Sequence, residues 1–247
     1  MAMKMKLRRR KARKQRSHRL IRAGDRTMTF VQSAGGGEDG FEPSVQEIDA
    51  ALAEVPDELD WEWSSRRLVP IFERGYAEGV TGDPMINSVT SLGIGIGFGI
   101  DLGPMVGRVT RSMCQRWEAS VEQLERAAFA HLAEVVAGVN PSDVQPIVLQ
   151  GHFFRALTVP LGWASSVILA GEPELIRIFG TRDAFFTAPT RHTLLAFGPA
   201  TPTRVVAGIT VECELQDPHP LQLDPFLLED GLLLWEGALT AESMDES

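Results

Sequence analysis

The chain has 247 residues, a hydrophobic content of 44% and a formal net charge of −9, values typical of a globular protein with one or two domains. The charge is uneven, because residues 1–26 hold 12 Lys and Arg against a single acidic residue, whereas the rest holds 12 Lys and Arg against 32 Asp and Glu. The sequence has no run of about 20 apolar residues, so no membrane span is predicted. Charged residues interrupt the segment that follows the basic start, which argues against a secretory signal.

Residues 1–43 are predicted to form a disordered basic head and a glycine-rich linker, SAGGGEDG at 33–40, because neither can bury enough apolar surface to fold. The head, with its net charge of +11 over residues 1–26, would attract a polyanion such as nucleic acid. Its densest basic run consists of Arg8, Arg9, Arg10, Lys11, Arg13 and Lys14. The alternatives are a solvated tail, or a start of translation at Met28 that leaves residues 1–27 out of the protein.

One α+β domain is expected over residues 44–238, followed by an acidic tail at 239–247. Its first helix is predicted to begin at Ser44, which forms a capping-box pattern with Glu47, and to end before Pro56. A short apolar run, Leu68–Ile71, follows after an acidic segment.

Leu92–Leu102 is the most unusual predicted strand, because its large apolar residues alternate with Gly93, Gly95, Gly97 and Gly99. A period of two places all the large side chains on one face of the strand. Since glycine weakens a strand, the pattern predicts close packing by another element or by a ligand. The spacing does not match the glycine motifs that bind nucleotides, so packing is the preferred interpretation, and Val106–Thr110 is the expected hairpin partner.

A second capping-box pattern, Ser120 with Gln123, predicts a helix over Ser120–Val136. The central stretch 164–199 is expected to form an apolar strand (ASSVILA), then a helix opened by Pro173 and closed by Gly180, then two strands. Residues 203–215 fit both a helix and a strand. The remaining strand predictions are Ile147–Gln150, Ala156–Val159, Ala184–Ala188, Thr193–Phe197 and Leu232–Trp235.

Several short motifs resemble the YtpQ-like family of bacterial proteins of unknown function, over roughly residues 68–236. The shared features are an apolar strand running into Asp101, a Val109–Thr110 strand, Trp117 ahead of a helix, ASSVILA, a D-x-x-x-x-A-P-x-R run from Asp183 to Arg191, LLAF at 194–197, and HPLQLDPFL beginning at His219. The resemblance implies an α+β fold with a mixed or antiparallel sheet covered by helices. It also implies a helix rather than a strand over 203–215, and it implies no reaction.

Asp183, Arg191 and His192 are the densest polar set near the centre of the chain and the candidate ligand-binding residues. Arginine can bind an anion, and a histidine near a carboxylate can act as an acid or a base. The alternative is a turn with solvated charges together with a buried ion pair. Asp217, His219 and Asp224 offer metal-ligand atoms, but the prolines beside them predict a rigid connector, so neither a metal nor a cofactor is expected.

The sequence contains no coherent catalytic set, so we expect a non-enzymatic protein-binding or scaffold module with a protein partner. The first alternative is association with a polyanion or nucleic acid through the basic head, and the second is a small-ligand or enzymatic site near Asp183, Arg191 and His192. The two cysteines, Cys114 and Cys213, lie far apart in the sequence and suit a reducing compartment. A bacterial cytoplasm is the expected location.

Overall fold

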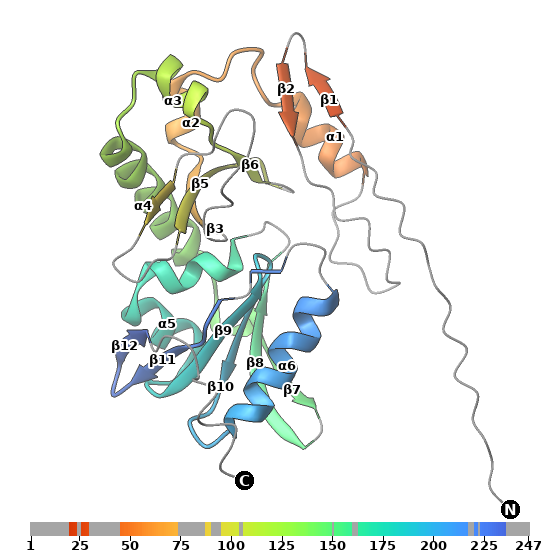
Figure 1. Ribbon diagram of the computed structural model, residues 1–247, viewed down its shortest axis with the longest axis vertical. Helices are drawn as coiled ribbons and strands as arrows, with labels where there is room; N and C mark the ends of the chain where they lie inside the picture. Colours follow the sequence, from red (N-terminus) through yellow and green to blue (C-terminus); the bar gives the residue numbers. More distant parts are fainter. Residues whose placement is uncertain are drawn as a thin grey trace, which may run out of the picture.

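The computed structural model describes residues 20–23, 26–29, 45–73, 87–89, 95–103, 106–149, 151–159, 163–216, 220–221 and 223–235. These residues form an α+β fold in which every strand pairing is antiparallel, and helices cover the sheets (Figure 1). The predicted fold class is therefore confirmed. Among the described helices, none combines the length and the apolar character needed to cross a lipid bilayer.

Two strands lie within the segment predicted to be an unfolded head. They are β1 (Leu20–Ala23) and β2 (Arg26–Thr29), which pair with each other in an antiparallel hairpin. The basic run from Arg8 to Lys14 lies outside the described residues.

The first larger sheet is built around β5 (Gly95–Asp101), which is bordered by β3 (Leu68–Glu73), β4 (Asn87–Val89) and β6 (Val106–Arg108). The glycine-alternating strand and its hairpin partner are confirmed. Close packing is confirmed at Gly99, where an added Cβ atom would lie 2.2 Å from Val106 Cγ1 of β6. Residues of α2 (Trp61–Ser65), α3 (Arg111–Trp117) and α4 (Val121–Ala137) pack in the core of this sheet, and α1 (Val45–Ala53) precedes them in the chain.

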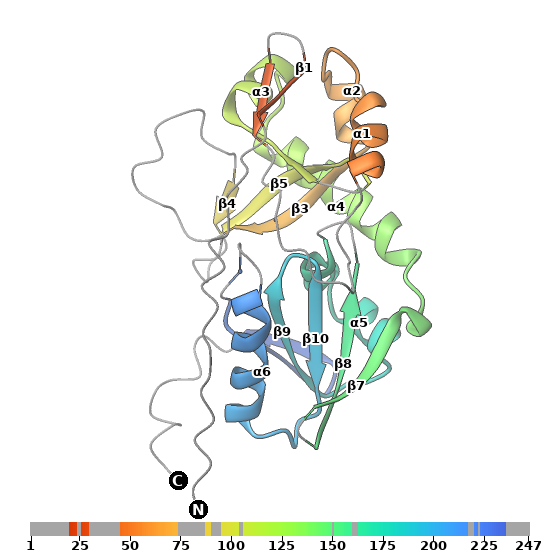
Figure 2. The same cartoon turned by 90° about the vertical axis from the view of Figure 1, so that its right-hand side faces the viewer.

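Helix α4 begins at the predicted capping box. The Gln123 backbone N–H donates to Ser120 Oγ at 3.3 Å, and the Ser120 N–H donates to Gln123 Oε1 at 2.8 Å. Its buried stripe is Leu124, Ala128, Leu132 and Val136, whereas Val121 is exposed. The first half of the stripe packs on the core of the first sheet and the second half on the core of the next sheet, so α4 spans both (Figure 2).

The second sheet has six strands in the order β12-β11-β9-β10-β8-β7. One face packs against α5 (Glu172–Phe179) and the other against α6 (Thr203–Gln216). The helix predicted for 203–215 is thus confirmed, with Val206, Ile209 and Thr210 buried on one side. The strands are β7 (Val144–Leu149), β8 (His152–Thr158), β9 (Ala184–Thr190), β10 (Thr193–Phe197), β11 (Phe226–Glu229) and β12 (Leu232–Trp235).

The strand predicted for ASSVILA is wrong, because Ala164–Ala170 forms a 3-10 helix, η2. Its buried residues Ala164, Val167 and Ile168 follow a helical spacing and belong to the core of the second sheet. A short, fully apolar run does not distinguish a buried strand from a buried helical segment. The small side chains at its start allow η2 to approach β3 closely, since Ser166 Oγ donates to Pro70 O at 2.6 Å.

Strand β3 connects the two larger sheets. Its Phe72 side chain is fully buried in the core of the second sheet, where its ring lies 6.0 Å from that of Phe226. The carbonyl groups of Pro70 and Phe72 accept hydrogen bonds from Ser166 Oγ and Arg191 Nη2. Backbone acceptors of β3 are thus satisfied by side chains of the second sheet's connections, which fixes this strand against them.

Candidate functional site

The three predicted ligand residues do not form one site. Asp183 precedes β9 and Arg191 follows it, which separates them by about 25 Å at about 3.3 Å per residue. The Asp183 carboxylate instead accepts the Asp230 backbone N–H at 2.8 Å and so stabilises the turn between β11 and β12. As the pairing of β9 with β10 implies, Asp183 lies at the far end of the strand, and Arg191 and His192 lie together in the turn at its other end.

Arg191 and His192 form the turn between β9 and β10, at the junction with η2 and β3. The Arg191 carbonyl accepts the Ser165 N–H at 3.3 Å, and the His192 carbonyl accepts the Val159 N–H at 3.0 Å. Arg191 Nη2 reaches Phe72 O at 3.3 Å. Both residues are partly buried.

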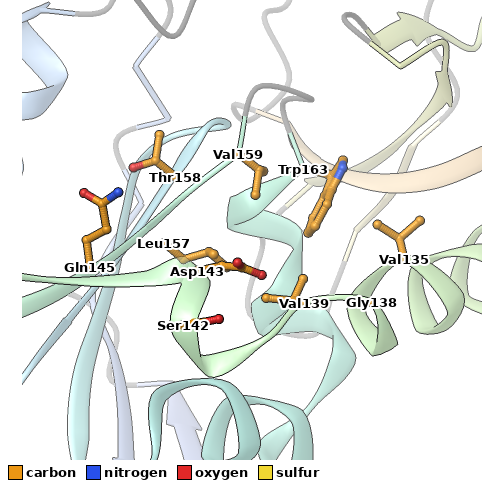
Figure 3. Close-up of a pocket in the computed structure, with 10 residues that line it drawn as sticks. All are labelled: Val135, Gly138, Val139, Ser142, Asp143, Gln145, Leu157, Thr158, Val159 and Trp163. Atoms are coloured by element: carbon orange, nitrogen blue, oxygen red, sulfur yellow. The ribbon is translucent and has the colours of Figure 1, made fainter. Parts of the chain in front are cut away.

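A surface pocket of about 530 Å³ lies between the end of α4 and the strands β7 and β8 (Figure 3). Figure 3 shows the Trp163 ring standing at one end of it, close to Val159 and Val135. The lining residues are Val135, Gly138, Val139, Ser142, Asp143, Gln145, Leu157, Thr158, Val159 and Trp163. With one carboxylate and no imidazole among them, these residues suit the binding of a mixed polar and apolar group more than acid–base chemistry.

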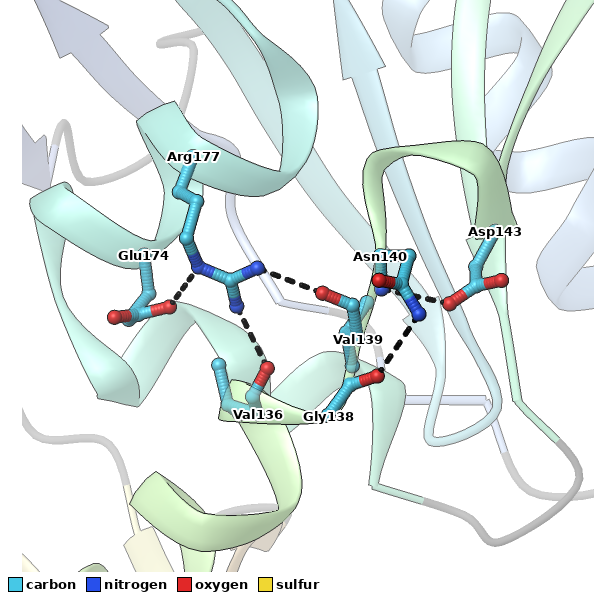
Figure 4. A network of polar contacts seen from close by, with 7 residues as sticks. All are labelled: Val136, Gly138, Val139, Asn140, Asp143, Glu174 and Arg177. Atoms are coloured by element: carbon cyan, nitrogen blue, oxygen red, sulfur yellow. Dashed lines mark hydrogen bonds and ion pairs between the residues drawn. The ribbon is translucent and has the colours of Figure 1, made fainter.

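The wall of this pocket is held by a network of polar contacts around the end of α4 (Figure 4). Arg177 of α5 donates to the carbonyls of Val136 and Val139, both at 2.7 Å, and pairs with Glu174 at 2.7 Å. The Asp143 carboxylate accepts the Asn140 N–H at 2.8 Å. Its role is therefore to cap the short 3-10 helix η1 (Pro141–Asp143).

Beyond the pocket, the β7–β8 hairpin ends in exposed apolar side chains. Val148, Leu149 and Phe153, which we call the hairpin patch, are 69%, 38% and 52% exposed. Val148 and Phe153 are cross-strand partners and share one face of the sheet. The sequence predicted a strand in each arm of this hairpin, Ile147–Gln150 and Ala156–Val159, with Phe153 and Phe154 just ahead of the second. Only Phe154 is buried, because successive side chains of a strand point to opposite faces.

The outer edge of β7 is poorly suited to pairing with another strand. Pro146 lies in the strand and has no N–H group to donate. The Val144 N–H is already bonded to Pro141 O of η1. Contact with a partner at this edge would therefore use side chains rather than a backbone ladder.

Titratable groups elsewhere offer little chemistry. Burial raises the pKa of the Cys213 thiol, and the neighbouring Glu212 and Glu214 carboxylates raise that pKa further. On α4, His131 Nε2 lies 3.7 Å from Asp101 Oδ2, and His131 Nδ1 lies 3.8 Å from Glu134 Oε2. His131 belongs neither to the lining of the pocket nor to the hairpin patch. In the part of the chain that the structure describes, no three His, Cys, Asp or Glu residues gather as a metal site; Asp217 and His219 lie outside it.

Comparisons with family models, with curated proteins and with solved structures gave no match. The resemblance to the YtpQ-like family therefore stays a prediction from the sequence motifs, and the function is argued from the geometry alone.

Proposed function

We propose that this chain is a non-enzymatic, cytoplasmic protein-binding module and that the hairpin patch is its docking surface. The observation that carries the proposal is the adjacent, exposed pair Val148 and Phe153, 69% and 52% exposed, at the end of a sheet whose other large side chains are mostly buried. Exposed apolar side chains that adjoin one another mark interaction surfaces more often than isolated ones do. The pocket lies at the other end of the same hairpin.

The partner should offer apolar side chains together with basic ones. Residues 27–247 carry 12 Lys and Arg against 32 Asp and Glu, so this part of the chain attracts basic partners and repels acidic ones. The Arg155 guanidinium, which bonds to Phe179 O, lies 5.9 Å from the centroid of the Phe153 ring. Aromatic rings provide rigid contact area.

The test is affinity purification of the full chain from native extract, compared with Val148→Asp and Phe153→Asp. The control is Leu215→Asp, because Leu215 is an equally apolar residue on α6 and is 82% exposed. A partner retained by the wild type and the Leu215 variant, but lost by both hairpin variants, supports the proposal. A partner that binds all four proteins equally, or confirmed turnover of a metabolite with no specific partner, overturns it.

The second candidate function is association with a polyanion through the basic head. Its support is the density of charge, a net of +11 within 26 residues, including Arg8, Arg9, Arg10, Lys11, Arg13 and Lys14. Binding by such a segment depends on counterion release and weakens steeply as salt rises. A filter-binding titration with single-stranded DNA between low and physiological salt tests it. Equal affinity after deletion of residues 1–27 would end this candidate.

A further inference from the structure

Buried hydrogen-bonding groups without partners gather beside the turn between β9 and β10. Within the described residues, Trp163 Nε1, Ser165 Oγ and His192 Nδ1 have no hydrogen-bond partner although all three atoms are buried. Trp163 and Ser165 are 5% and 1% exposed. Such groups are rare in folded proteins, and each is expected to be satisfied by a protein group, a water or an ion.

Backbone hydrogen bonds hold together the chain segments that carry these three groups. Trp163 immediately precedes η2, and Ser165 lies in its first turn. The Ser165 N–H bonds to Arg191 O, next to His192. The His192 carbonyl in turn bonds to the Val159 N–H, four residues ahead of Trp163. The chain segments 159, 163–165 and 191–192 are therefore tied to one another.

The chemistry of these groups specifies an acceptor. The indole N–H can only donate, the serine hydroxyl donates readily, and the imidazole donates from a protonated Nδ1. Arg191 adds a guanidinium that is oriented by its contact with Phe72 O. Donors combined with a fixed cation favour an anionic oxygen, since charge-assisted hydrogen bonds are roughly twice as strong as neutral ones.

We infer that Trp163, Ser165, Arg191 and His192 form a binding site for a small oxyanion, a carboxylate or phosphate group. The acidic balance of the surrounding chain gives no general attraction for such a ligand, so the affinity comes from these groups. The burial of Trp163 and Ser165 limits the bound part to a compact group. The site is independent of the hairpin patch and of the basic head.

The experiment is a thermal-shift and calorimetric titration of the full chain with inorganic phosphate and, separately, with acetate, at constant ionic strength with chloride as the reference. The test variants are Trp163→Phe, which keeps an aromatic ring but removes the N–H, and Ser165→Ala. The chain offers matched controls: Trp117, whose Nε1 already donates to Leu59 O at 2.7 Å, and Ser166, whose Oγ already donates to Pro70 O. We therefore use Trp117→Phe and Ser166→Ala alongside.

We expect phosphate or acetate to raise the melting temperature of the wild type, because a ligand that binds the folded state stabilises it. Trp163→Phe and Ser165→Ala should weaken that anion about 10- to 100-fold, the effect of losing a hydrogen bond to a charged group. The two control variants should lower the melting temperature yet keep the anion-dependent rise. The inference is overturned if neither anion stabilises the wild type more than chloride, or if the controls lose the rise to the same extent.

Discussion

Gly99 offers the sharpest test of how the first sheet is packed. An added Cβ atom would lie 2.2 Å from Val106 Cγ1 and 3.6 Å from Ile71 Cδ1. The first distance is more than 1 Å shorter than the 3.4 Å at which ordinary contact begins, so Val106 must change its rotamer or β6 must move. Gly99→Ala is therefore expected to overpack the hairpin of β5 and β6.

Overpacking costs about 1–3 kcal/mol, and alanine recovers about 0.5–1 kcal/mol of backbone entropy. We expect Gly99→Ala to lower the free energy of unfolding by about 1–2 kcal/mol, which corresponds to about 2–8 °C in melting temperature for a chain of this size. Urea unfolding monitored by tryptophan fluorescence measures the change. In a Val106→Ala background the clash is absent, so Gly99→Ala should no longer cost stability and should instead stabilise the protein by about 0.5–1 kcal/mol.

Gly208 provides the control, because it lies on α6 and no atom lies within 4 Å of a Cβ added there. Gly208→Ala is expected to stabilise the protein by about 0.5–1 kcal/mol, the difference in helix propensity. If Gly99→Ala left stability unchanged, or if its cost stayed the same after Val106→Ala, the close approach of β6 would not be the reason for glycine at this position.

The remaining predictions concern a helix cap and a thiol. Ser120→Ala should cost about 1 kcal/mol in urea unfolding because the Gln123 N–H loses its acceptor, and a change below about 0.3 kcal/mol would contradict this role. The pKa of the Cys213 thiol is raised in the folded protein, so this thiol stays protonated at a pH at which it ionises in the unfolded chain. Its contribution to the stability of the folded state should therefore fall as pH rises above about 8.5. In a Cys114→Ser variant, the pH profile of alkylation by iodoacetamide should lie at higher pH in buffer than in urea, and coincident profiles would refute the shift.

Much of the fold follows from local patterns in the sequence. The capping box at Ser120, the left-handed Gly180 that ends α5, and the alternating glycines of β5 each act through neighbouring residues, and their elements were predicted correctly. The ambiguous segment 203–215 forms a helix because Val206, Ile209 and Thr210 meet the sheet at helical spacing. The strand that the same residues also fitted is therefore not formed.

The errors occur where tertiary contacts decide. ASSVILA forms η2 because it fits between two sheets and bonds to Pro70, a partner 96 residues away. The exposure of Phe153 and the lack of a hydrogen-bond partner at Trp163 Nε1 depend on which helices cover which parts of the sheet. Patterns of neighbouring residues in the sequence do not contain that information.

The place of Phe72 has a consequence for biosynthesis. Because the ribosome releases the N-terminal part first, β3 leaves it well before β9 and β11, whose residues later enclose this ring with Phe186 and Phe226. Until those strands arrive, a large aromatic side chain remains solvated on nascent β3. A proteolytic fragment beginning at Arg111 would contain the six-stranded sheet but lack Phe72, which leaves a cavity in the core of that sheet. Such a fragment should regain its core packing only when β3 is supplied as a peptide.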